Sequence, residues 1–190
     1  MNIIFVRHGE SENNADADFN SLNPKLTKKG KEQARALGKR LKRYNTSERY
    51  ASKLQRANET GEIISGITRV PIKENLEELT EYRAKHIRSR IKARFNSEHN
   101  RKLRKLKRFL RGISRGKNED KTVLITAHGF TNRVIFSKLL EMPVNRKLFQ
   151  FSRDNTCMNM LVLDNKHKNW RVQHFNGINH LPENLRGRAC

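Results

Sequence analysis

The sequence predicts an α/β fold, a single domain with a mostly parallel central sheet flanked by helices. Two short apolar segments, Asn2–Val6 and Thr122–Thr126, have the character of buried strands. Each ends near a histidine and a glycine, in Arg7-His8-Gly9 and Ala127-His128-Gly129. Helical patterns alternate with strand-like segments along the chain, which is typical of the α/β class. Since ligands bind outside the carboxyl ends of the strands in such sheets, both histidines are candidate site residues.

The first half of the chain contains four further helical or strand-like patterns. The polar stretch Ser11–Lys25 indicates a loop, and Thr27 is suited to cap the helix that follows it. A short strand is expected at Tyr50–Ala51 and a helix over Arg56–Ile64. We also expect a strand at Val70–Ile72.

The second half contains a long basic helical pattern and a hairpin. Apolar residues recur at spacings of three and four over 87–113, with an interruption expected near Ser97–Asn100. A helix is expected from Gly129 to about Leu140, and Met158–Leu163 is expected to pair with Trp170–His174. No internal repeat or domain boundary is evident, so residues 1–190 are predicted to form one domain with a short basic helical cap at about 82–117.

The composition favours a cytoplasmic protein. Cys157 and Cys190 are too few for a disulfide framework. No apolar stretch approaches the roughly 18 residues of a membrane-spanning helix, and the amino terminus lacks the features of a secretory signal. The oligomeric state cannot be predicted from these features.

The net charge of +22 is high, and it is concentrated in one segment. Between residues 83 and 117 the only acidic residue is Glu98. The basic residues there are Arg83, Lys85, Arg88, Arg90, Lys92, Arg94, Arg101, Lys102, Arg104, Lys105, Lys107, Arg108, Arg111, Arg115 and Lys117. Such a charge attracts phosphate esters and nucleic acids, so a polyanion or nucleic-acid contact through region 83–117 is one hypothesis. A charge run is more often a solvated helix face, which is the competing interpretation.

Four segments together resemble the motifs of a known family. They are Arg7–Asn14, Leu26–Ala34, Ala51–Thr60 and Ala127–Gly129, and they occur in order over most of the chain. They resemble the signature of the histidine phosphatase superfamily, which includes the cofactor-dependent phosphoglycerate mutases. The resemblance implies a phosphoglycerate mutase-like fold and covalent phosphoryl chemistry on a histidine, with no cofactor and no metal.

The residue types at these positions suit that chemistry. Arg7 and Arg56 can grip a phosphate dianion with paired, charge-assisted hydrogen bonds. A neutral His8 imidazole can attack phosphorus, and neighbouring cations favour the neutral ring. By resemblance, His128 completes the pocket and donates to the charge that develops on the transferred group.

The leaving oxygen needs a proton, and by resemblance a carboxylic acid supplies it. Two glutamates fit the family pattern, in Leu76-Glu77-Glu78 and Leu79-Thr80-Glu81. The spacing from Pro71 favours Glu81 as the catalytic acid, with Glu78 as the alternative. The remaining acid of this run would be part of a solvated helix start.

Three residues are expected to contact the substrate besides these. Asn14 aligns with a pocket asparagine of the family and is suited to donate to a phosphate oxygen. Arg83 is placed to meet a second anionic group, and Glu78 is assigned to the substrate-binding positions when Glu81 is the acid. Phe130 stands where the family often has a glycine, and we expect it to narrow the pocket or to contact the substrate.

These features favour a metal-independent histidine phosphatase that hydrolyses a phosphorylated small molecule or a phosphoprotein. The interval from Glu81 to His128 is short for the family, and a small cap leaves a phosphohistidine open to water. A phosphoglycerate mutase-type phosphotransferase is the first alternative. A basic nucleic-acid or polyanion-binding protein on the same fold is the second.

Overall fold

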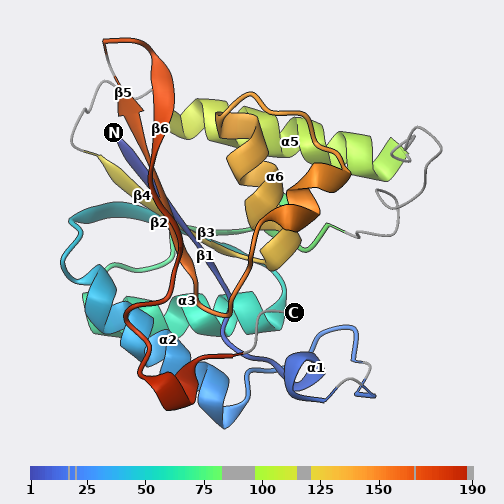
Figure 1. Cartoon of the computed structure of the whole chain (residues 1–190), viewed down its shortest axis with the longest axis vertical. Helices are drawn as coiled ribbons and strands as arrows, with labels where there is room; N and C mark the ends of the chain where they lie inside the picture. Colours follow the sequence, from blue (N-terminus) through green and yellow to red (C-terminus); the bar gives the residue numbers. More distant parts are fainter. Residues whose placement is uncertain (17, 20, 83–96, 115–120, 165, 188–190) are drawn as a thin grey trace.

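A computed structural model of the chain describes residues 1–16, 18–19, 21–82, 97–114, 121–164 and 166–187 (Figure 1). Its centre is a sheet with the strand order β3-β2-β4-β1-β5-β6. The strands are β1 (Asn2–Arg7), β2 (Thr46–Ser52), β3 (Glu74–Leu76), β4 (Thr122–Ala127), β5 (Met158–Asp164) and β6 (Asn169–Gly177). The first four strands in this order run parallel to one another. Strand β5 pairs antiparallel with β1 on one side and with β6 on the other. The predicted mostly parallel α/β sheet is therefore confirmed.

Four longer helices cover the two faces of the sheet (Figure 1). One face carries α2 (Lys28–Leu41) and α3 (Gln55–Thr68), and the other carries α5 (Ser97–Ser114) and α6 (Gly129–Leu139). Shorter elements are α1 (Glu12–Ala15), η1 (Glu77–Leu79), η2 (Arg146–Gln150) and η3 (Glu183–Leu185). The Thr27 hydroxyl accepts a hydrogen bond of 3.0 Å from the Gly30 amide, so the predicted cap of α2 is formed.

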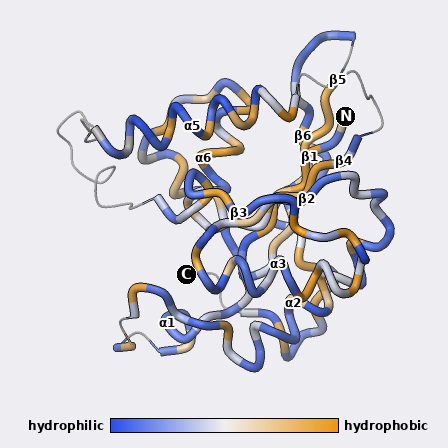
Figure 2. The backbone as a smooth tube through the Cα atoms, turned by 180° about the vertical axis from the view of Figure 1, so that it is seen from behind, coloured by the Kyte–Doolittle hydropathy of each residue, from blue (hydrophilic) through white to orange (hydrophobic). Residues whose placement is uncertain are grey.

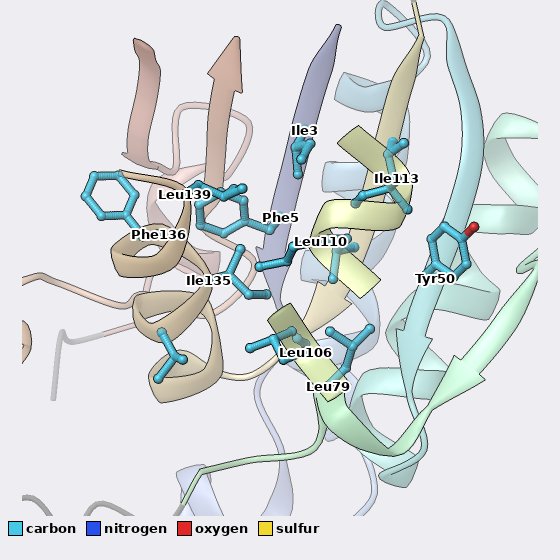
Figure 3. Close-up of a cluster of buried hydrophobic side chains, with 14 of the residues drawn as sticks. Ile3, Phe5, Tyr50, Leu79, Leu106, Leu110, Ile113, Ile135, Phe136 and Leu139 are labelled. Carbon is cyan, nitrogen blue, oxygen red and sulfur yellow. The ribbon is translucent and has the colours of Figure 1, made fainter. Parts of the chain in front are cut away.

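The alternation of strand β1 divides the core between these two helical layers. Ile3 and Phe5 pack with the apolar stripe of α5 and with α6, as Figure 3 shows for Leu106, Leu110, Ile113 and Ile135. Ile4 and Val6 belong to the second cluster, whose helical members are Leu37, Leu41 and Ile64. A strand buried on both faces reads as a continuous apolar run, which is why Asn2–Val6 was recognisable in the sequence.

Three expectations for the first half of the chain need correction. The loop predicted over Ser11–Lys25 contains the one-turn helix α1, and the strand predicted at Tyr50–Ala51 extends over all of β2. The strand predicted at Val70–Ile72 is wrong, because the strand lies at β3 instead. The Val70 carbonyl accepts a hydrogen bond from the Arg49 side chain, and pairing with β2 becomes regular only from Glu74.

The long helical pattern is confirmed where the structure describes it. Helix α5 begins at Ser97, within the segment where an interruption of the pattern is predicted, and it is helical from there to Ser114. The apolar positions at Ile87, Ile91 and Phe95 lie outside the described residues. The predicted hairpin is formed by β5 and β6. Strand β6 is longer than the predicted segment Trp170–His174. Among the described residues, no helix is long and apolar enough to cross a membrane.

Candidate active site

The two motif histidines meet at the carboxyl edge of the sheet. His8 follows β1 and His128 follows β4, and these parallel strands are neighbours, with Arg7 in register with Ala127. The two rings have centroids 5.2 Å apart with an interplanar angle of 60°. Both side chains are buried, with 2% and 0% exposure. Parallel pairing of two strands therefore brings together residues that are 120 positions apart in the sequence.

The hydrogen bonds of His8 define which ring nitrogen is free to react. The Nδ1 atom lies 2.6 Å from the carbonyl oxygen of Gly9, which can only accept, so Nδ1 carries the proton. The Arg56 Nε donates to His8 Nε2 over 3.1 Å, and a donor there requires a lone pair on Nε2. Both contacts specify the same neutral tautomer, with Nε2 as the nucleophilic atom.

Burial and three neighbouring groups keep His8 neutral. The pKa of the His8 imidazole lies well below its usual value, chiefly because burial disfavours the charged ring. Arg7, His128 and Arg56 lower the pKa further, in that order of effect. An imidazole that is neutral at physiological pH is the form that attacks phosphorus.

The two arginines of the motifs come from different elements. Arg7 ends β1 and donates through Nη1 to the carbonyl oxygen of Arg153, while Arg56 lies in the first turn of α3. Burial lowers the pKa of Arg56, and Arg7 lowers it further, whereas Glu81 raises it. Two guanidinium groups that repel each other around a neutral nucleophile favour the binding of an anion.

His128 is held by a serine that sequence analysis did not single out. Its Nε2 lies 2.8 Å from the Ser52 Oγ at the end of β2, and that oxygen accepts a hydrogen bond from the Leu54 amide. The His128 Nδ1 is buried and has no hydrogen-bond partner among the described residues. Burial, then Arg56 and Lys102, hold the pKa of His128 well below its usual value. This imidazole is therefore also neutral.

The side-chain carboxyl group of Glu81 lies against the first turn of α6. Its Oε1 accepts hydrogen bonds from the backbone amides of Phe130 and Thr131, at 3.0 and 3.3 Å. Burial raises the pKa of the Glu81 carboxyl, and the opposing effects of Arg56, Arg7 and Arg153 do not cancel it. A carboxyl group whose pKa is raised, near the two motif arginines, has the environment that suits a general acid.

The segment that carries Glu81 is anchored by helix α5. The Lys102 Nζ donates to the Thr80 carbonyl and hydroxyl, both at 2.7 Å, and to the Glu81 carbonyl at 3.2 Å. It also lies 4.2 Å from the centroid of the Tyr82 ring. Burial lowers the pKa of Lys102 to about 8. Lys102 therefore holds the backbone carbonyl groups on both sides of the Glu81 Cα, to which the acidic side chain is attached.

The structure separates the two candidate acids. Glu78 lies in η1 and lines a surface groove with Lys53, Lys105 and Arg108, away from both site histidines. Glu81, in contrast, interacts electrostatically with Arg7 and Arg56. The structure therefore brings Glu81 to the cluster around His8, whereas Glu78 lies in a separate groove, and the choice between the two acids stays a prediction.

The loop after His8 is held by Asn14 and by its neighbours. The Asn14 Oδ1 accepts from the Ser11 amide and hydroxyl and from the Asn155 Nδ2, at distances of 3.1 to 3.3 Å. The same Asn155 amide donates to the His8 carbonyl oxygen at 3.2 Å. These bonds occupy the oxygen of Asn14 and leave its nitrogen to donate. Arg83, the remaining predicted contact, lies outside the described residues.

Two glycines allow this loop to pack directly on α2. A Cβ on Gly9 would lie 2.4 Å from the Gly30 carbonyl oxygen, and a Cβ on Gly30 would lie 2.0 Å from the Glu10 carbonyl oxygen. The Gly9 amide donates to the Thr60 Oγ1 at 3.0 Å. Contact between two backbones thus sets the position of His8 relative to α2 and α3.

The sequence did not indicate three further residues of this cluster, which are Ser52, Lys102 and Arg153. Ser52 stands inside the arginine motif Ala51–Thr60 as the last residue of a strand, and Lys102 is recognisable as a cation on the apolar stripe of a helix. Arg153 has no such signal, although its side chain packs on Gly129 and its carbonyl oxygen accepts from Arg7. The expectation that Phe130 contacts the substrate is not supported, because its ring is 1% exposed and packs in the core against Phe149.

No group of three or more His, Cys, Asp or Glu side chains suited to a metal ion occurs in the described part of the chain.

No curated protein sequence gives a significant match. The likeness to solved structures extends over most of the chain. A phosphoserine phosphatase from Entamoeba histolytica in complex with phosphoserine is 23% identical, with a TM-score of 0.76 over 95% of this chain and 99% of that one.

A mycobacterial glucosyl-3-phosphoglycerate phosphatase in complex with VO3 is 18% identical, with a TM-score of 0.73 over 93% and 98% of the two chains. At these identities the likeness is one of fold. The family model described as histidine phosphatase superfamily (branch 1) matches residues 3–177, a span that holds both histidine motifs and the arginine motif. The chain therefore belongs to the histidine phosphatase superfamily, branch 1.

Proposed function

We propose that this protein is a phosphomonoester hydrolase that acts through a phosphohistidine on His8. The observation that carries the proposal is the pair of hydrogen bonds of the His8 ring, with Nδ1 against the Gly9 carbonyl and Nε2 facing Arg56. They support a protonated Nδ1 and a nucleophilic Nε2 within reach of two guanidinium groups. A phosphate ester bound by Arg7 and Arg56 would present its phosphorus to that nitrogen.

In the first step, the lone pair on His8 Nε2 forms a bond to phosphorus while the bond from phosphorus to the ester oxygen breaks. The departing oxygen takes a proton from the Glu81 carboxyl. Arg7 and Arg56 stabilise the charge on the transferred group, and His128 donates to one of its oxygens. Asn14 contributes a further donor through its amide nitrogen.

In the second step, water attacks phosphorus and the bond to Nε2 breaks, which restores neutral His8. The Glu81 carboxylate takes the proton from that water, so each turnover begins and ends with the same protonation state. No metal ion is assigned to either step. If another phosphoryl acceptor replaced water, the same intermediate would make the protein a phosphoglycerate mutase-type phosphotransferase.

Hydrolysis of an aryl phosphate in the presence of EDTA tests the proposal. We expect phosphate release by the native protein and none by His8→Ala. Persistent hydrolysis by a folded His8→Ala variant would exclude His8 as the nucleophile. Transfer between phosphoglycerate positions that exceeds phosphate release would favour the phosphotransferase.

A comparison of two variants assigns the acid. With an alkyl phosphate, whose leaving oxygen needs a proton, we expect Glu81→Gln to lower kcat about 100-fold, within the usual range for general acid catalysis. Glu78→Gln is the matched control and should retain native kcat. The opposite result would assign the acid to Glu78.

The substrate class is proposed to be a phosphorylated small molecule or a phosphoprotein. Phosphoserine in the complex of the Entamoeba histolytica structure makes a small phosphorylated metabolite the first compound to test. A panel of phosphorylated metabolites, phosphopeptides and phosphohistidine protein, ranked by kcat/KM, distinguishes these classes. The cytoplasmic location stays a prediction.

A further inference from the structure

Helix α5 presents a continuous row of cations to solvent. Its apolar side is buried, with Leu106, Leu110 and Ile113 at 6% exposure or less, so its outer side is set by the remaining positions. Those positions, which we call the basic face, are Arg101, Arg104, Lys107 and Arg111, whereas Lys105 and Arg108 line a separate groove with Glu74, Glu77 and Glu78. Cations at spacings of three and four recur on every turn of the helix, about 5.4 Å apart. Figure 2 shows the alternation of hydrophilic and hydrophobic positions along α5.

One end of the basic face opens into a groove, which we call the far groove, with a volume of about 830 Å³. It is bounded by the last turns of α5 and α6 and by the β5–β6 turn. The residues that matter below are Lys107, Arg111, Lys138, Lys168 and Trp170. The β5–β6 turn lies beside the first residue of the chain, since the Leu163 amide donates to the Met1 carbonyl. His8 follows the opposite end of β1, so the far groove is at the other edge of the sheet from the candidate active site.

The cations of the far groove are not neutralised within the described part of the chain. None of the ion pairs found there involves Lys107, Arg111, Lys138 or Lys168. The pKa of Lys138 is lowered by burial and further by repulsion from the charge of Lys107. Glu141 is the one acidic residue among the described lining residues. Unneutralised cations held close together by three separate elements are suited to bind an anionic ligand.

Two features of this surface decide between classes of polyanion. The apolar side of α5 is packed in the core and the large exposed apolar residues lie on other elements, so this helix has no face to insert into a lipid surface. The far groove contains Trp170, a half-buried aromatic ring set among lysines. In proteins that bind single-stranded nucleic acid, unpaired bases stack on aromatic rings while neighbouring cations bind the phosphates. The side chains of an acidic peptide have no base to stack on such a ring.

We propose that the basic face and the far groove bind single-stranded nucleic acid, with phosphates along α5 and a base stacked on Trp170. This activity is separate from the proposed hydrolysis and uses no residue of the site around His8. RNA and DNA share the chemistry that these residues recognise, so oligonucleotides of both kinds enter the test.

The test measures the anisotropy of a labelled 20-nucleotide RNA, and of DNA of the same sequence, over a range of salt concentrations. We expect affinity to fall steeply with salt, since each neutralised phosphate of a single strand contributes a slope of about −0.7. The variant Lys107→Gln/Arg111→Gln/Lys138→Gln/Lys168→Gln should bind at least 10-fold more weakly and lose about 3 from the magnitude of the slope. Its hydrolysis of an aryl phosphate should be unchanged.

The matched control makes the same change in charge on the opposite face of the sheet. Lys28→Gln/Lys31→Gln/Arg35→Gln/Lys39→Gln removes four exposed cations from α2. We expect this control to retain most of the affinity and of the slope. Equal weakening by both variants would contradict the proposal, because binding would then depend on net charge alone.

Trp170 provides a second measurement on the native protein. It is the only tryptophan of the chain, so the fluorescence of the protein reports on the far groove. We expect oligonucleotide binding to quench this emission and Trp170→Ala to weaken binding about 10-fold, with Trp170→Phe closer to native. Unchanged emission on saturation would contradict the proposal, as would displacement of the oligonucleotide by polyglutamate at an equal concentration of charge. Binding should survive His8→Ala unaltered.

Discussion

At the scale of single residues, burial changes the chemistry of side chains whose names alone suggest little. His8 and His128 are neutral because their surroundings disfavour a third and fourth positive charge beside Arg7 and Arg56. The same burial raises the pKa of Glu81 although those arginines oppose it. Desolvation therefore favours the neutral form of the proposed nucleophile and shifts the proposed proton donor toward its neutral form as well.

Three lowered histidine pKa values predict a loss of stability in mild acid. The unfolded chain binds protons on His8, His128 and His180 below about pH 6.5. In the folded chain, burial holds the pKa of His8 and of His128 well below that value and lowers the pKa of His180 to about 4. The free energy of unfolding should therefore fall as the pH drops below 6.5, by up to about 4.1 kcal/mol per pH unit for three protons. Glu81, whose pKa is raised, offsets at most one of these protons, which leaves about 2.7 kcal/mol.

Urea denaturation between pH 7.5 and 5.5 measures this dependence. His128→Gln should reduce the slope against pH by about one proton, and His174→Gln is the control because that side chain is half-exposed and outside the site. A free energy of unfolding that stays constant over this range would contradict the neutral state of the buried histidines.

At the scale of elements, α5 holds the segment that carries Glu81. Its apolar stripe packs on the sheet, and its inward-facing Lys102 holds the backbone at Thr80 and Glu81. The first turn of α6 supplies the amides that receive the Glu81 carboxyl. The position of the proposed acid is thus set by two helices, neither of which carries it.

Removal of the Lys102 ammonium should impair proton donation selectively. We expect Lys102→Met to lower kcat about 10-fold on an alkyl phosphate and less than twofold on p-nitrophenyl phosphate, whose leaving group needs no acid. Lys105→Met is the control, because that side chain is exposed on the same helix. An equal loss on both substrates would show that Lys102 supports the fold or phosphate binding rather than the acid.

The contact between the His8 loop and α2 predicts opposite effects for two glycine substitutions. Gly30→Ala should destabilise the protein by about 2 to 3 kcal/mol, because its Cβ would meet the Glu10 carbonyl at 2.0 Å and the backbone must move. Gly66→Ala should stabilise it by about 1 kcal/mol, since a Cβ there meets no atom within 4 Å and alanine favours helix α3. Urea denaturation at pH 7.5 measures both, and a Gly30→Ala variant of native stability would refute the close contact.

At the scale of the whole molecule, the two edges of the sheet would separate the two proposed kinds of anion binding. The carboxyl edge holds the buried Arg7 and the half-buried Arg56 around the neutral His8 imidazole. The far groove at the amino edge of β1 holds exposed cations on α5 and on the β5–β6 turn, with the half-buried Lys138 of α6. Buried arginines specify geometry, whereas exposed cations supply a screened attraction. The high net charge therefore contributes more to the proposed binding on the protein surface than to the candidate active site.

The parts of this arrangement that were predictable are those that depend on local pattern. Asn2–Val6 and Thr122–Thr126 are recognisable because both faces of a central parallel strand are apolar, and the glycines after His8 and His128 mark the turns. The strand at β3 was misplaced because three residues of edge strand have too little hydrophobic pattern, and a long-range bond from Arg49 decides where pairing begins. Arg153 and Ser52 join the site through tertiary contacts, which leave no periodic signal.

The proposed hydrolysis depends most directly on a covalent bond between His8 Nε2 and phosphorus. The native protein should be mixed with a radiolabelled phosphomonoester, quenched in alkali within milliseconds and digested for mass spectrometry. We predict label on the peptide that contains His8, stable in alkali and lost in acid, and no label in His8→Ala. Steady hydrolysis without a labelled intermediate, or label on another residue, would contradict a phosphohistidine on His8.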